Sequence, residues 1–303
     1  GASVARSLKS RGIEPIIIDQ EKSLAMGASG NLAAIQAPRL STVNTPSGRL
    51  SISGYRFARD LSKELDSSLD DKSYVLAIPE RERSRQYKLL KQGWPKDLIR
   101  EITKEDRENI FSNELYFEGI VHDYGGTIKP LKIINEMISE NIEVILNSKV
   151  EQFIRNINGW EVRLHNGDKF FSDALVLCCA EGLKGFKQTS AFDLQYTQGQ
   201  VTYLQEEMLK ASPKCNLSFS GYITPSIDGR ITVGSTFEKY NSRRYEVSEE
   251  GHKDNINKIA DYIRRNLFDD INFNNLDGKV SMRVSAYDRM PMMGLIEKDL
   301  YII

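Results

Sequence analysis

The sequence predicts an α/β protein with two domains: a discontinuous Rossmann-like nucleotide-binding domain and an inserted, mostly antiparallel β domain. Helical patterns lead into apolar strands at 1–19 and 129–147, whereas 190–280 shows period-two alternation with tight turns. Helix–strand alternation favours a parallel sheet, and alternating strands favour an antiparallel one. We expect the nucleotide-binding domain at 1–45, 129–188 and 280–303, and a substrate-binding domain at 46–128 and 189–279.

The first element is a helix of about ten residues that begins at Gly1. Pro15–Asp19 then has the pattern of a short buried strand that ends in an acid. Together they form half of a βαβ unit, whose first strand we expect upstream of Gly1. In dinucleotide-binding units the last glycine of the first turn permits close packing, and an acid about 20 residues later accepts ribose hydroxyls. Gly1 and Asp19 fit these roles, with chance agreement as the alternative.

A loop of small residues follows, with Gly27, Ser29, Gly30 and Asn31 in the stretch GASGN. It offers backbone amides and one hydroxyl with little side-chain bulk. A flat cofactor that passes close to the backbone requires such a loop. The alternative is a flexible loop without a ligand.

The remaining elements follow in order along the chain. The pattern predicts helices at about 46–70, 81–92, 129–141 and 249–266, of which the third has a proline in its first turn. Short strands are expected at 142–147, 149–156 and in the hairpins that follow, and SIDGR predicts a tight hairpin turn. The continuous apolar run at 173–182 is typical of a parallel strand buried on both faces. The last residues begin another strand.

Composition indicates an ordinary globular protein: 303 residues, 40% hydrophobic, 27% charged and a net charge of −1. No apolar run approaches the roughly 18 residues of a membrane helix. Three cysteines, Cys178, Cys179 and Cys215, form no disulfide framework and are expected to be reduced and buried in a cytoplasmic protein. Three scattered histidines and no CxxC motif predict no metal site.

The net charge gives no support for nucleic-acid binding, but the local distribution is uneven. Seven basic residues and two acids lie between Arg81 and Arg100. A solvated helix face is one interpretation, and a phosphate-contacting patch is the other.

Three motifs carry a resemblance to the D-amino-acid oxidase/glycine oxidase class of flavoproteins. Arg283, Asp288, Pro291 and Gly294 resemble its R-x4-D-x2-P-x2-G signature. The segment 221–236 is similar to its Y-[LI]-x-P-x-x-D-G-R hairpin, and 174–182 to its third flavin-contacting strand. Segments 27–41, 119–134 and 198–201 are similar to one branch, the flavin domain of bifunctional proteins that modify the wobble uridine of tRNA.

The resemblance implies noncovalent FAD and oxidation of a secondary amine that carries a carboxymethyl group. In that branch the substrate is 5-carboxymethylaminomethyl(-2-thio)uridine in tRNA, and the group leaves as glyoxylate. The resemblance implies that Arg283 clamps the substrate carboxylate and that Tyr222 helps to hold it. The alternative for Arg283 is a surface salt bridge, and the alternative for Tyr222 is an aromatic side chain on a sheet face without a ligand. The resemblance assigns FAD binding to Gly1, Asp19, Gly27, Ser29, Gly30, Asn31, Val150, Ala180 and Gly182.

The same resemblance gives the basic helix a role as a tRNA contact, through Arg81, Arg83, Arg85, Lys88 and Lys91. A methyltransferase domain is expected either upstream of the chain or as a separate protein, and a glycine-rich stretch that caps the flavin is expected downstream. Two positions depart from the pattern: the branch has a basic residue at Tyr287 and a small or amide residue at Glu181. Two other functions stay open, a small-molecule amine or amino-acid oxidase and a flavin-less interaction fold.

Overall fold

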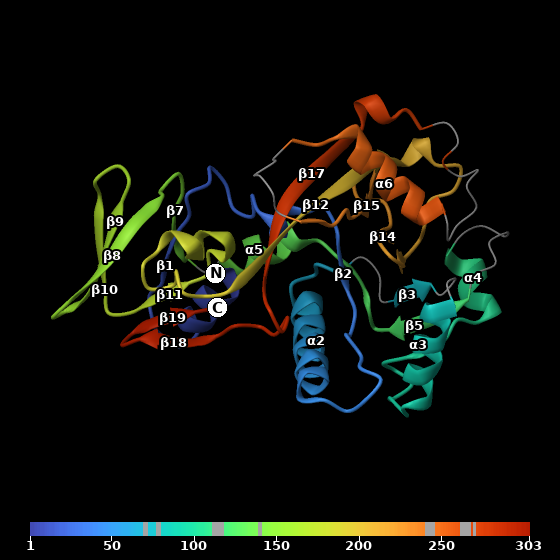
Figure 1. Ribbon diagram of the computed structural model, residues 1–303, viewed down its shortest axis with the longest axis horizontal. Helices are drawn as coiled ribbons and strands as arrows, with labels where there is room; N and C mark the ends of the chain where they lie inside the picture. The colour runs from blue at the N-terminus through green and yellow to red at the C-terminus, as the bar shows by residue number, and fades with distance from the viewer. Residues whose placement is uncertain are drawn as a thin grey trace.

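The structure is a computed structural model that describes residues 1–68, 72–76, 80–110, 118–138, 141–239, 246–260, 268 and 271–303. The molecule is elongated, with several small sheets at one end and a large sheet at the other (Figure 1). Two long strands, β12 (Leu194–Gln205) and β17 (Asp277–Ala286), run between the two ends and pair along their length. These strands connect the two halves of the fold.

Parallel strand pairs join segments that are far apart in the sequence at the end that holds both termini. β1 (Ile16–Ile18) pairs with β7 (Glu143–Ile145), and β11 (Leu175–Leu177) pairs with β19 (Leu300–Ile302). β18 (Gly294–Glu297) adds to β19 in the antiparallel direction. Helix α1 (Ala2–Lys9) packs against α5 (Pro130–Ile138). The predicted α/β class is confirmed.

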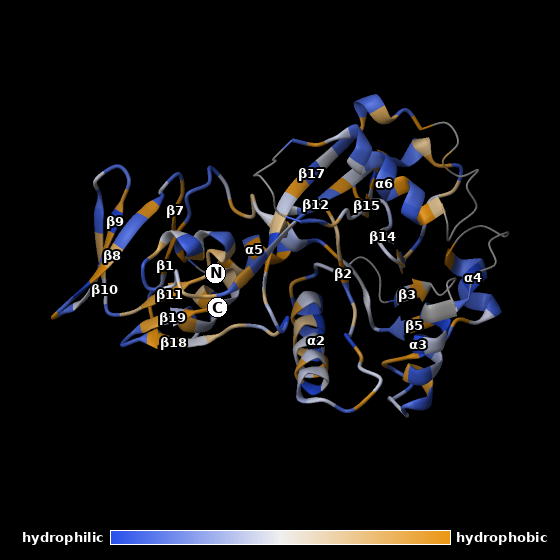
Figure 2. Ribbon diagram, viewed as in Figure 1, coloured by the Kyte–Doolittle hydropathy of each residue, from blue (hydrophilic) through white to orange (hydrophobic). Residues whose placement is uncertain are grey.

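A three-stranded antiparallel sheet extends this end of the molecule. Its strands are β8 (Val150–Asn156), β9 (Gly159–Leu164) and β10 (Lys169–Ser172). Trp160 and Phe153 are buried in a core shared with Leu177 and Leu300, so this sheet packs on the β11–β19 pair. Figure 2 shows hydrophobic residues in β11 and β19, where that core forms.

The large sheet is mainly antiparallel, with the strand order β16-β12-β15-β14-β13-β3-β5-β4 and β17 on β12. β3 and β13 form its parallel pair. Asp228 and Gly229 both have positive φ in the turn before β15, as the predicted tight hairpin requires. The remaining strands of this sheet are β3 (Lys72–Leu76), β4 (Arg100–Glu101), β5 (Gly119–Asp123), β13 (Asn216–Ser218), β14 (Tyr222–Ile223), β15 (Arg230–Gly234) and β16 (Glu238–Lys239). β2 (Ala34–Gln36) and β6 (Gly126–Ile128) form a separate antiparallel pair.

Helix α6 (Glu249–Ala260) covers one face of the large sheet, because a Cβ on its Gly251 would meet the Gln200 side chain of β12 at 2.5 Å. Helices α3 (Glu80–Lys91) and α4 (Lys104–Ile110) lie near the β3–β5 edge and are largely hydrophilic (Figures 1 and 2). α2 (Pro46–Glu64) begins at the cap Thr45, whose hydroxyl accepts a hydrogen bond from the Gly48 amide at 3.1 Å. The face of β12 opposite α6 is the one that forms the candidate site.

Two details differ from the sequence-based expectations. The strand predicted at 173–182 ends at Leu177 and is only half-buried, because β11 lies at a sheet edge with one neighbour. Ala180 then turns the chain with a φ of 45° into the 3-10 helix η2 (Ala180–Gly185). Cys179 is therefore exposed rather than buried, and all three cysteines are free thiols. The helix predicted at 46–70 ends at Glu64, and the part of the predicted helix 249–266 that follows Ala260 lies outside the described residues.

Candidate active site

One face of β17 carries a row of three polar side chains. Lys279, Ser281 and Arg283 alternate along the strand and therefore point to the same side. They lie opposite Val201, Gly199 and Thr197 of β12. This face is turned toward the loop of small residues, because the 3-10 helix η1 (Ala28–Gly30) contacts β17. The two strands and the loop together enclose the candidate site.

Arg283 is half-buried, and its guanidinium lies over the backbone of Gly199. A Cβ at Gly199 would stand 2.4 Å from Nη1, so this glycine is needed for the close approach. Nη1 donates to the carbonyl of Thr236 at 3.3 Å, and Nη2 donates to the Ser235 hydroxyl. The Phe237 ring lies 4.3 Å from Cζ. No acidic side chain among the described residues pairs with this guanidinium, and burial lowers its pKa.

Tyr222 of β14 lies beside Arg283. Burial raises the pKa of Tyr222 to about 12, and the nearby Tyr203 adds to the rise, whereas Arg283 and a hydrogen bond with Asn31 oppose it. Tyr222 is therefore a neutral phenol at ordinary pH. The contact with Asn31 joins the two predicted catalytic residues to the predicted cofactor loop.

Gly30 is the most tightly packed residue of that loop. A Cβ there would lie 1.9 Å from the Ala25 carbonyl oxygen and 2.1 Å from Nζ of Lys279. The Lys279 ammonium donates to the Ala25 carbonyl at 3.4 Å, and burial lowers its pKa. Tyr203 of β12 is hydrogen-bonded to the backbone of Leu32 and closes the same face. Only glycine fits at position 30.

Asp19 lies directly after β1, as predicted. Its amide donates to the Ile145 carbonyl at 2.9 Å, and its Oδ1 accepts the amide of Glu21 at 2.9 Å. Ser148 donates its amide to the Asp19 carbonyl at 2.9 Å, which holds the chain just before Val150. Asp19 and the start of β8 therefore lie close together.

Gly1, Ala180 and Gly182 gather at the end of β11. A Cβ on Gly1 would meet Cys178 at 3.9 Å, and one on Gly182 would meet Cys179 at 3.2 Å. Helix η2, which holds Ala180 and Gly182, also contacts β17. Ala180 and Gly182 thus adjoin the strand that carries Arg283, and Gly1 lies beside Cys178 at the end of β11.

Gly27 and Ser29 are exposed, and a Cβ on Gly27 would meet nothing within 4 Å. Their assignment to the cofactor therefore remains a prediction. Three further residues on the site face, Lys279, Ser281 and Tyr203, did not emerge from sequence reasoning. The signal was available for two of them, since the period-two pattern places Lys279 and Ser281 on the face of Arg283.

The residues present fit a bound dinucleotide. Asp19 offers a carboxylate at the end of a parallel strand, and the loop residues Gly27 to Ser29, just before the tightly packed Gly30, are small and exposed. The Ser281 hydroxyl is buried and has no hydrogen-bond partner among the described residues, which is unusual unless a ligand supplies one. Lys279 adds a cation for an anionic ligand group.

The predicted basic helix forms as α3, and its polar face is exposed. Arg85, Lys88 and Lys91 are exposed, while Gln86 and Leu89 are buried beneath them. Arg83 forms an ion pair with Glu118 at 3.5 Å, and the side chain of Arg81 lies outside the described residues.

Arg100 is one of the basic residues counted between 81 and 100, but its side chain is not available to a phosphate-contacting patch. Its guanidinium is bound by Asp106 and Asp123, each at 2.6 Å. The basic surface is therefore smaller than the sequence count suggests. No group of three or more metal-ligating side chains occurs in the described part of the chain. No helix there is long and apolar enough to cross a bilayer.

The mixed α/β fold and a site with room for a dinucleotide agree with a class of oxidoreductases that use a flavin dinucleotide. A family model for FAD dependent oxidoreductases (DAO) matches residues 1–303, and the chain belongs to this family. It is an FAD-dependent oxidoreductase.

Two curated relatives carry the name tRNA 5-methylaminomethyl-2-thiouridine biosynthesis bifunctional protein MnmC. The one from Pseudoalteromonas translucida is 30% identical over 311 residues, covering 98% of this chain and 46% of the relative. The one from Methylobacillus flagellatus is 26% identical over 305 residues, covering 97% and 46%. The chain thus spans about half the length of the curated relatives it matches.

Solved structures with the same fold include glycine oxidase from Geobacillus kaustophilus, with a TM-score of 0.79 at 16% identity, covering 100% of this chain and 85% of that one. Iminodiacetate oxidase from Chelativorans sp. has a TM-score of 0.76 at 17% identity, covering 99% and 86%. At these identities the comparison establishes the fold, which agrees with the family model.

Proposed function

We propose that the protein removes the carboxymethyl group, as glyoxylate, from 5-carboxymethylaminomethyl(-2-thio)uridine at the wobble position of tRNA. One observation carries the proposal: Arg283 is a half-buried cation with no acidic partner among the described residues. A desolvated charge without a counter-ion is unfavourable, so this site is complete only when an anion binds. The substrate carboxylate is that anion.

Arg283 is arranged to bind a carboxylate through two parallel hydrogen bonds. A guanidinium presents a planar fork that matches the two oxygens of a carboxylate. Gly199 lets the fork lie flat on β12, and Ser235 and Thr236 fix its orientation. The side chain is therefore held in place before the substrate arrives, which reduces the entropy cost of binding.

Tyr222 supplies a second hydrogen bond to the substrate. With a pKa of about 12 it keeps its phenolic proton and donates to an oxygen atom. The contact with Asn31 holds the phenol between the carboxylate site and the cofactor loop. The substrate is thereby positioned with its glycine-like methylene toward that loop.

FAD would be held by Asp19, by the loop at Gly30 and by the residues at the end of β11, with Lys279 and Ser281 facing the loop from β17. Bound FAD would supply the two-electron oxidation of the methylene next to the amine, and hydrolysis of the resulting imine by water would release glyoxylate and leave the aminomethyl nucleoside. Tyr203 of β12 and Tyr222 of β14 flank the site, and burial raises the pKa of both phenols.

Two observations support tRNA as the carrier of this amine. The curated relatives are named for biosynthesis of 5-methylaminomethyl-2-thiouridine in tRNA. Helix α3 exposes Arg85, Lys88 and Lys91 as contacts for a phosphate backbone. A methyltransferase activity that completes the modification would lie in a fused domain or a separate protein.

The proposal is tested by incubating the FAD-loaded protein with tRNA that carries carboxymethylaminomethyluridine. Nucleoside mass spectrometry should show conversion to aminomethyluridine together with an equal amount of glyoxylate. Oxidation of free glycine or sarcosine without any change in the tRNA would instead identify a small-molecule amine oxidase.

A further inference from the structure

A layer of polar side chains is buried between helix α6 and β12, on the face of β12 opposite the candidate site. Gln200 of β12 lies at its centre and is 2% exposed. Its Nε2 donates to the carbonyl of Ser248, just before α6, at 2.9 Å, and its Oε1 accepts the Ser248 amide at 2.9 Å. Asn255 of α6 donates to the Gln200 carbonyl at 3.0 Å. Gln200 is therefore fixed from the α6 side through both its side chain and its backbone.

The pairing of β12 with its neighbours is irregular at Gln200. Val201 pairs with Gly234 of β15, and Gln198 pairs with Glu238 of β16. Two residues of β12 therefore face three residues of the segment that joins β15 to β16. An extra residue of this kind forms a β-bulge, which redirects groups that a regular ladder would pair. The bulged segment is the one that contacts the guanidinium of the candidate site.

Thr236, in the middle of that segment, pairs with β12 partly through its hydroxyl. Its amide donates to the Gln200 carbonyl at 3.1 Å, as in a regular ladder. The Gln200 amide donates to Oγ1 of Thr236 at 2.9 Å, where a regular pair would offer a backbone carbonyl. The Thr236 carbonyl is thus free to accept Nη1 of Arg283 at 3.3 Å.

A second contact joins α6 to the same guanidinium. Nζ of Lys258 donates to the Ser235 carbonyl at 3.3 Å, and an ion pair with Asp254 at 2.6 Å holds the lysine in place. The Ser235 hydroxyl accepts a hydrogen bond from Nη2 of Arg283. Helix α6 is therefore connected to both residues that hold the guanidinium.

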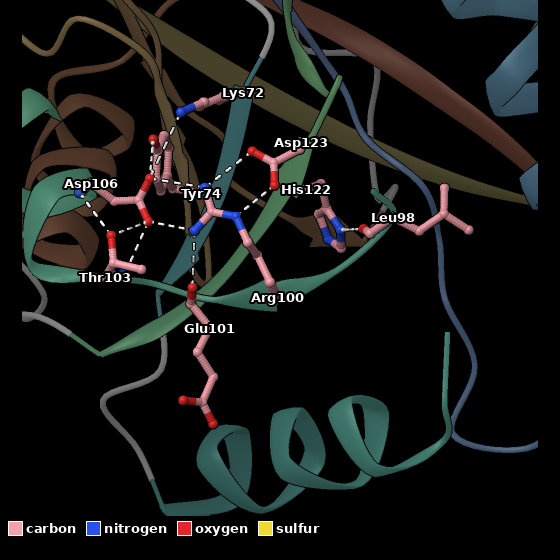
Figure 3. Close-up of polar contacts among 9 residues, drawn as sticks. All are labelled: Lys72, Tyr74, Leu98, Arg100, Glu101, Thr103, Asp106, His122 and Asp123. Carbon is pink, nitrogen blue, oxygen red and sulfur yellow. Dashed lines mark hydrogen bonds and ion pairs between the residues drawn. The ribbon is translucent and has the colours of Figure 1, made fainter. Parts of the chain in front are cut away.

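The groups that hold Arg283 are neutral, which distinguishes it from Arg100 of the same sheet. Arg100 is bound by Asp106 and Asp123, each at 2.6 Å (Figure 3). Carboxylates fix a guanidinium and also compensate its charge, whereas a hydroxyl and a carbonyl fix it and leave the charge for a ligand. The contacts from the α6 side therefore orient Arg283 without occupying it with an anion.

We propose that Gln200 and Thr236 are positioning residues for the Arg283 clamp. Gln200 is held by α6, and its amide holds the Thr236 hydroxyl, so that the Thr236 carbonyl is directed at the guanidinium. The inference rests on the proposed function, because it takes Arg283 as the group that binds the substrate carboxylate. It goes further in that it assigns the orientation of Arg283 to a helix on the opposite face of β12.

The test measures binding of acetate, the smallest carboxylate probe, to the FAD-loaded protein by NMR titration of the acetate methyl signal. Thr236→Val keeps the side-chain shape but removes the hydroxyl, so the Gln200 amide competes with Arg283 for the Thr236 carbonyl. Acetate affinity should fall about fivefold, the cost of ordering one long side chain on binding. Thr236→Ser retains the hydroxyl and should stay within about twofold of the unaltered protein.

Gln200→Met tests the connection to α6. Methionine has nearly the same length and volume as glutamine but makes no hydrogen bonds to Ser248. Acetate affinity should again fall about fivefold, with the FAD content unchanged.

Thr202→Val is the matched control, because Thr202 is a fully buried threonine of β12 whose hydroxyl also contacts α6. Its Oγ1 lies 2.8 Å from Nδ1 of His252 and accepts Nδ2 of Asn255 at 3.1 Å. Neither contact involves the segment that holds the guanidinium. Thr202→Val should lower the thermal midpoint and leave acetate affinity within about twofold of the unaltered protein.

A double-mutant cycle with Arg283→Met separates positioning from general stability. In the Arg283→Met background, Gln200→Met and Thr236→Val should cause no further loss of acetate affinity, because the side chain that they position is absent. A loss of the same factor in both backgrounds would show that the two residues act independently of Arg283 and would overturn the inference.

Unchanged acetate affinity in Thr236→Val and Gln200→Met would also overturn it, while leaving the proposed function intact, provided that the tRNA is still converted. Equal acetate binding by Arg283→Met and the unaltered protein would instead overturn the Arg283 clamp, and with it both the proposed function and this inference. A loss in Thr202→Val as large as that in Thr236→Val would reduce the effect to packing between α6 and β12 and would contradict the inference.

Discussion

Arg283 is the residue on which the proposed chemistry depends. It is half-buried, its hydrogen bonds go to a neutral hydroxyl and a neutral carbonyl, and no acid pairs with it among the described residues. A surface salt bridge, the alternative for this arginine, is absent within that part of the chain. Arg100 shows the contrast, because two carboxylates bind it and leave it no capacity for a substrate. The two arginines differ in environment, not in residue type.

Arg283→Met should therefore remove the carboxylate clamp while leaving the fold intact. Loss of one member of a desolvated charge pair costs about 2–5 kcal/mol, so kcat/KM for the tRNA substrate should fall roughly 30-fold or more. Steady-state kinetics with the FAD-loaded variant measures the effect. Arg163→Met is the control, since that arginine lies in the separate three-stranded sheet and is paired with Glu161 at 2.6 Å, and its activity should stay near that of the unaltered protein. A fall of equal size in both variants would argue against a specific clamp.

At the scale of single elements, the sequence predicted most of the helices and strands. It predicted less well which of their side chains are buried and which residues they contact. The proline at Pro130 and the turn at Asp228 and Gly229 are local signals, and both elements form where expected. The exposure of Cys179 was not predictable, because it depends on β11 lying at a sheet edge. Which partner a side chain finds across the sheet is set by register, and no short pattern encodes it.

The candidate site shows the same division. Arg283 and Tyr222 lie in motifs and could be named from the sequence alone. Their contacts to Ser235 and Asn31 join segments far apart in the chain, so only the structure shows them. Similarly, the excess of basic residues between Arg81 and Arg100 is visible in the sequence. The ion pair between Arg100 and Asp106, which removes Arg100 from the exposed basic surface, is visible only in the structure.

Helix α3 gives a prediction at this scale. Arg85→Glu together with Lys88→Glu should weaken tRNA binding and lower the salt slope by about 1.5, because two phosphate contacts are lost. Binding measured across a salt series, with FAD content as a check, gives both values. Lys210→Glu with Lys214→Glu changes the net charge equally at exposed positions elsewhere and should leave the slope unchanged. An unaltered slope in the α3 variant would exclude this helix as a backbone contact.

At the scale of the whole molecule, buried titratable groups set the response to acid. Burial lowers the pKa of His122, whose Nδ1 is 2.6 Å from the Leu98 carbonyl oxygen, and the pKa of His252 is lowered for the same reason. Burial alone would raise the pKa of Asp106, but hydrogen bonds from Arg100 and Thr103 hold it below its usual range. The two kinds of group act in different pH windows.

A histidine with a lowered folded pKa takes up its proton mainly in the unfolded state, so stability falls as the pH drops below about 6.5. The depressed Asp106 contributes stability above its unfolded pKa of about 3.9, and this is lost as the pH falls toward the folded pKa. Acid therefore destabilises the fold first through the histidines and then through the Arg100 network.

His122→Asn keeps a side-chain N–H that can donate to the Leu98 carbonyl, and it removes the imidazole that takes up a proton. The decrease in unfolding free energy between pH 7 and pH 5 should shrink by up to about 2 kcal/mol, the full effect of one suppressed histidine. Denaturant melts at the two pH values measure it. An unchanged decrease in His122→Asn would mean that His122 accepts a proton in the folded state.

The proposed function is oxidation of the carboxymethylamino group of the tRNA wobble nucleoside. Nucleoside mass spectrometry of tRNA from cells that lack the gene tests it most directly. We expect carboxymethylaminomethyluridine to accumulate, and we expect the unaltered gene, but not one encoding Arg283→Met, to restore the normal profile. A wobble-uridine profile that does not change when the gene is removed would contradict the claim.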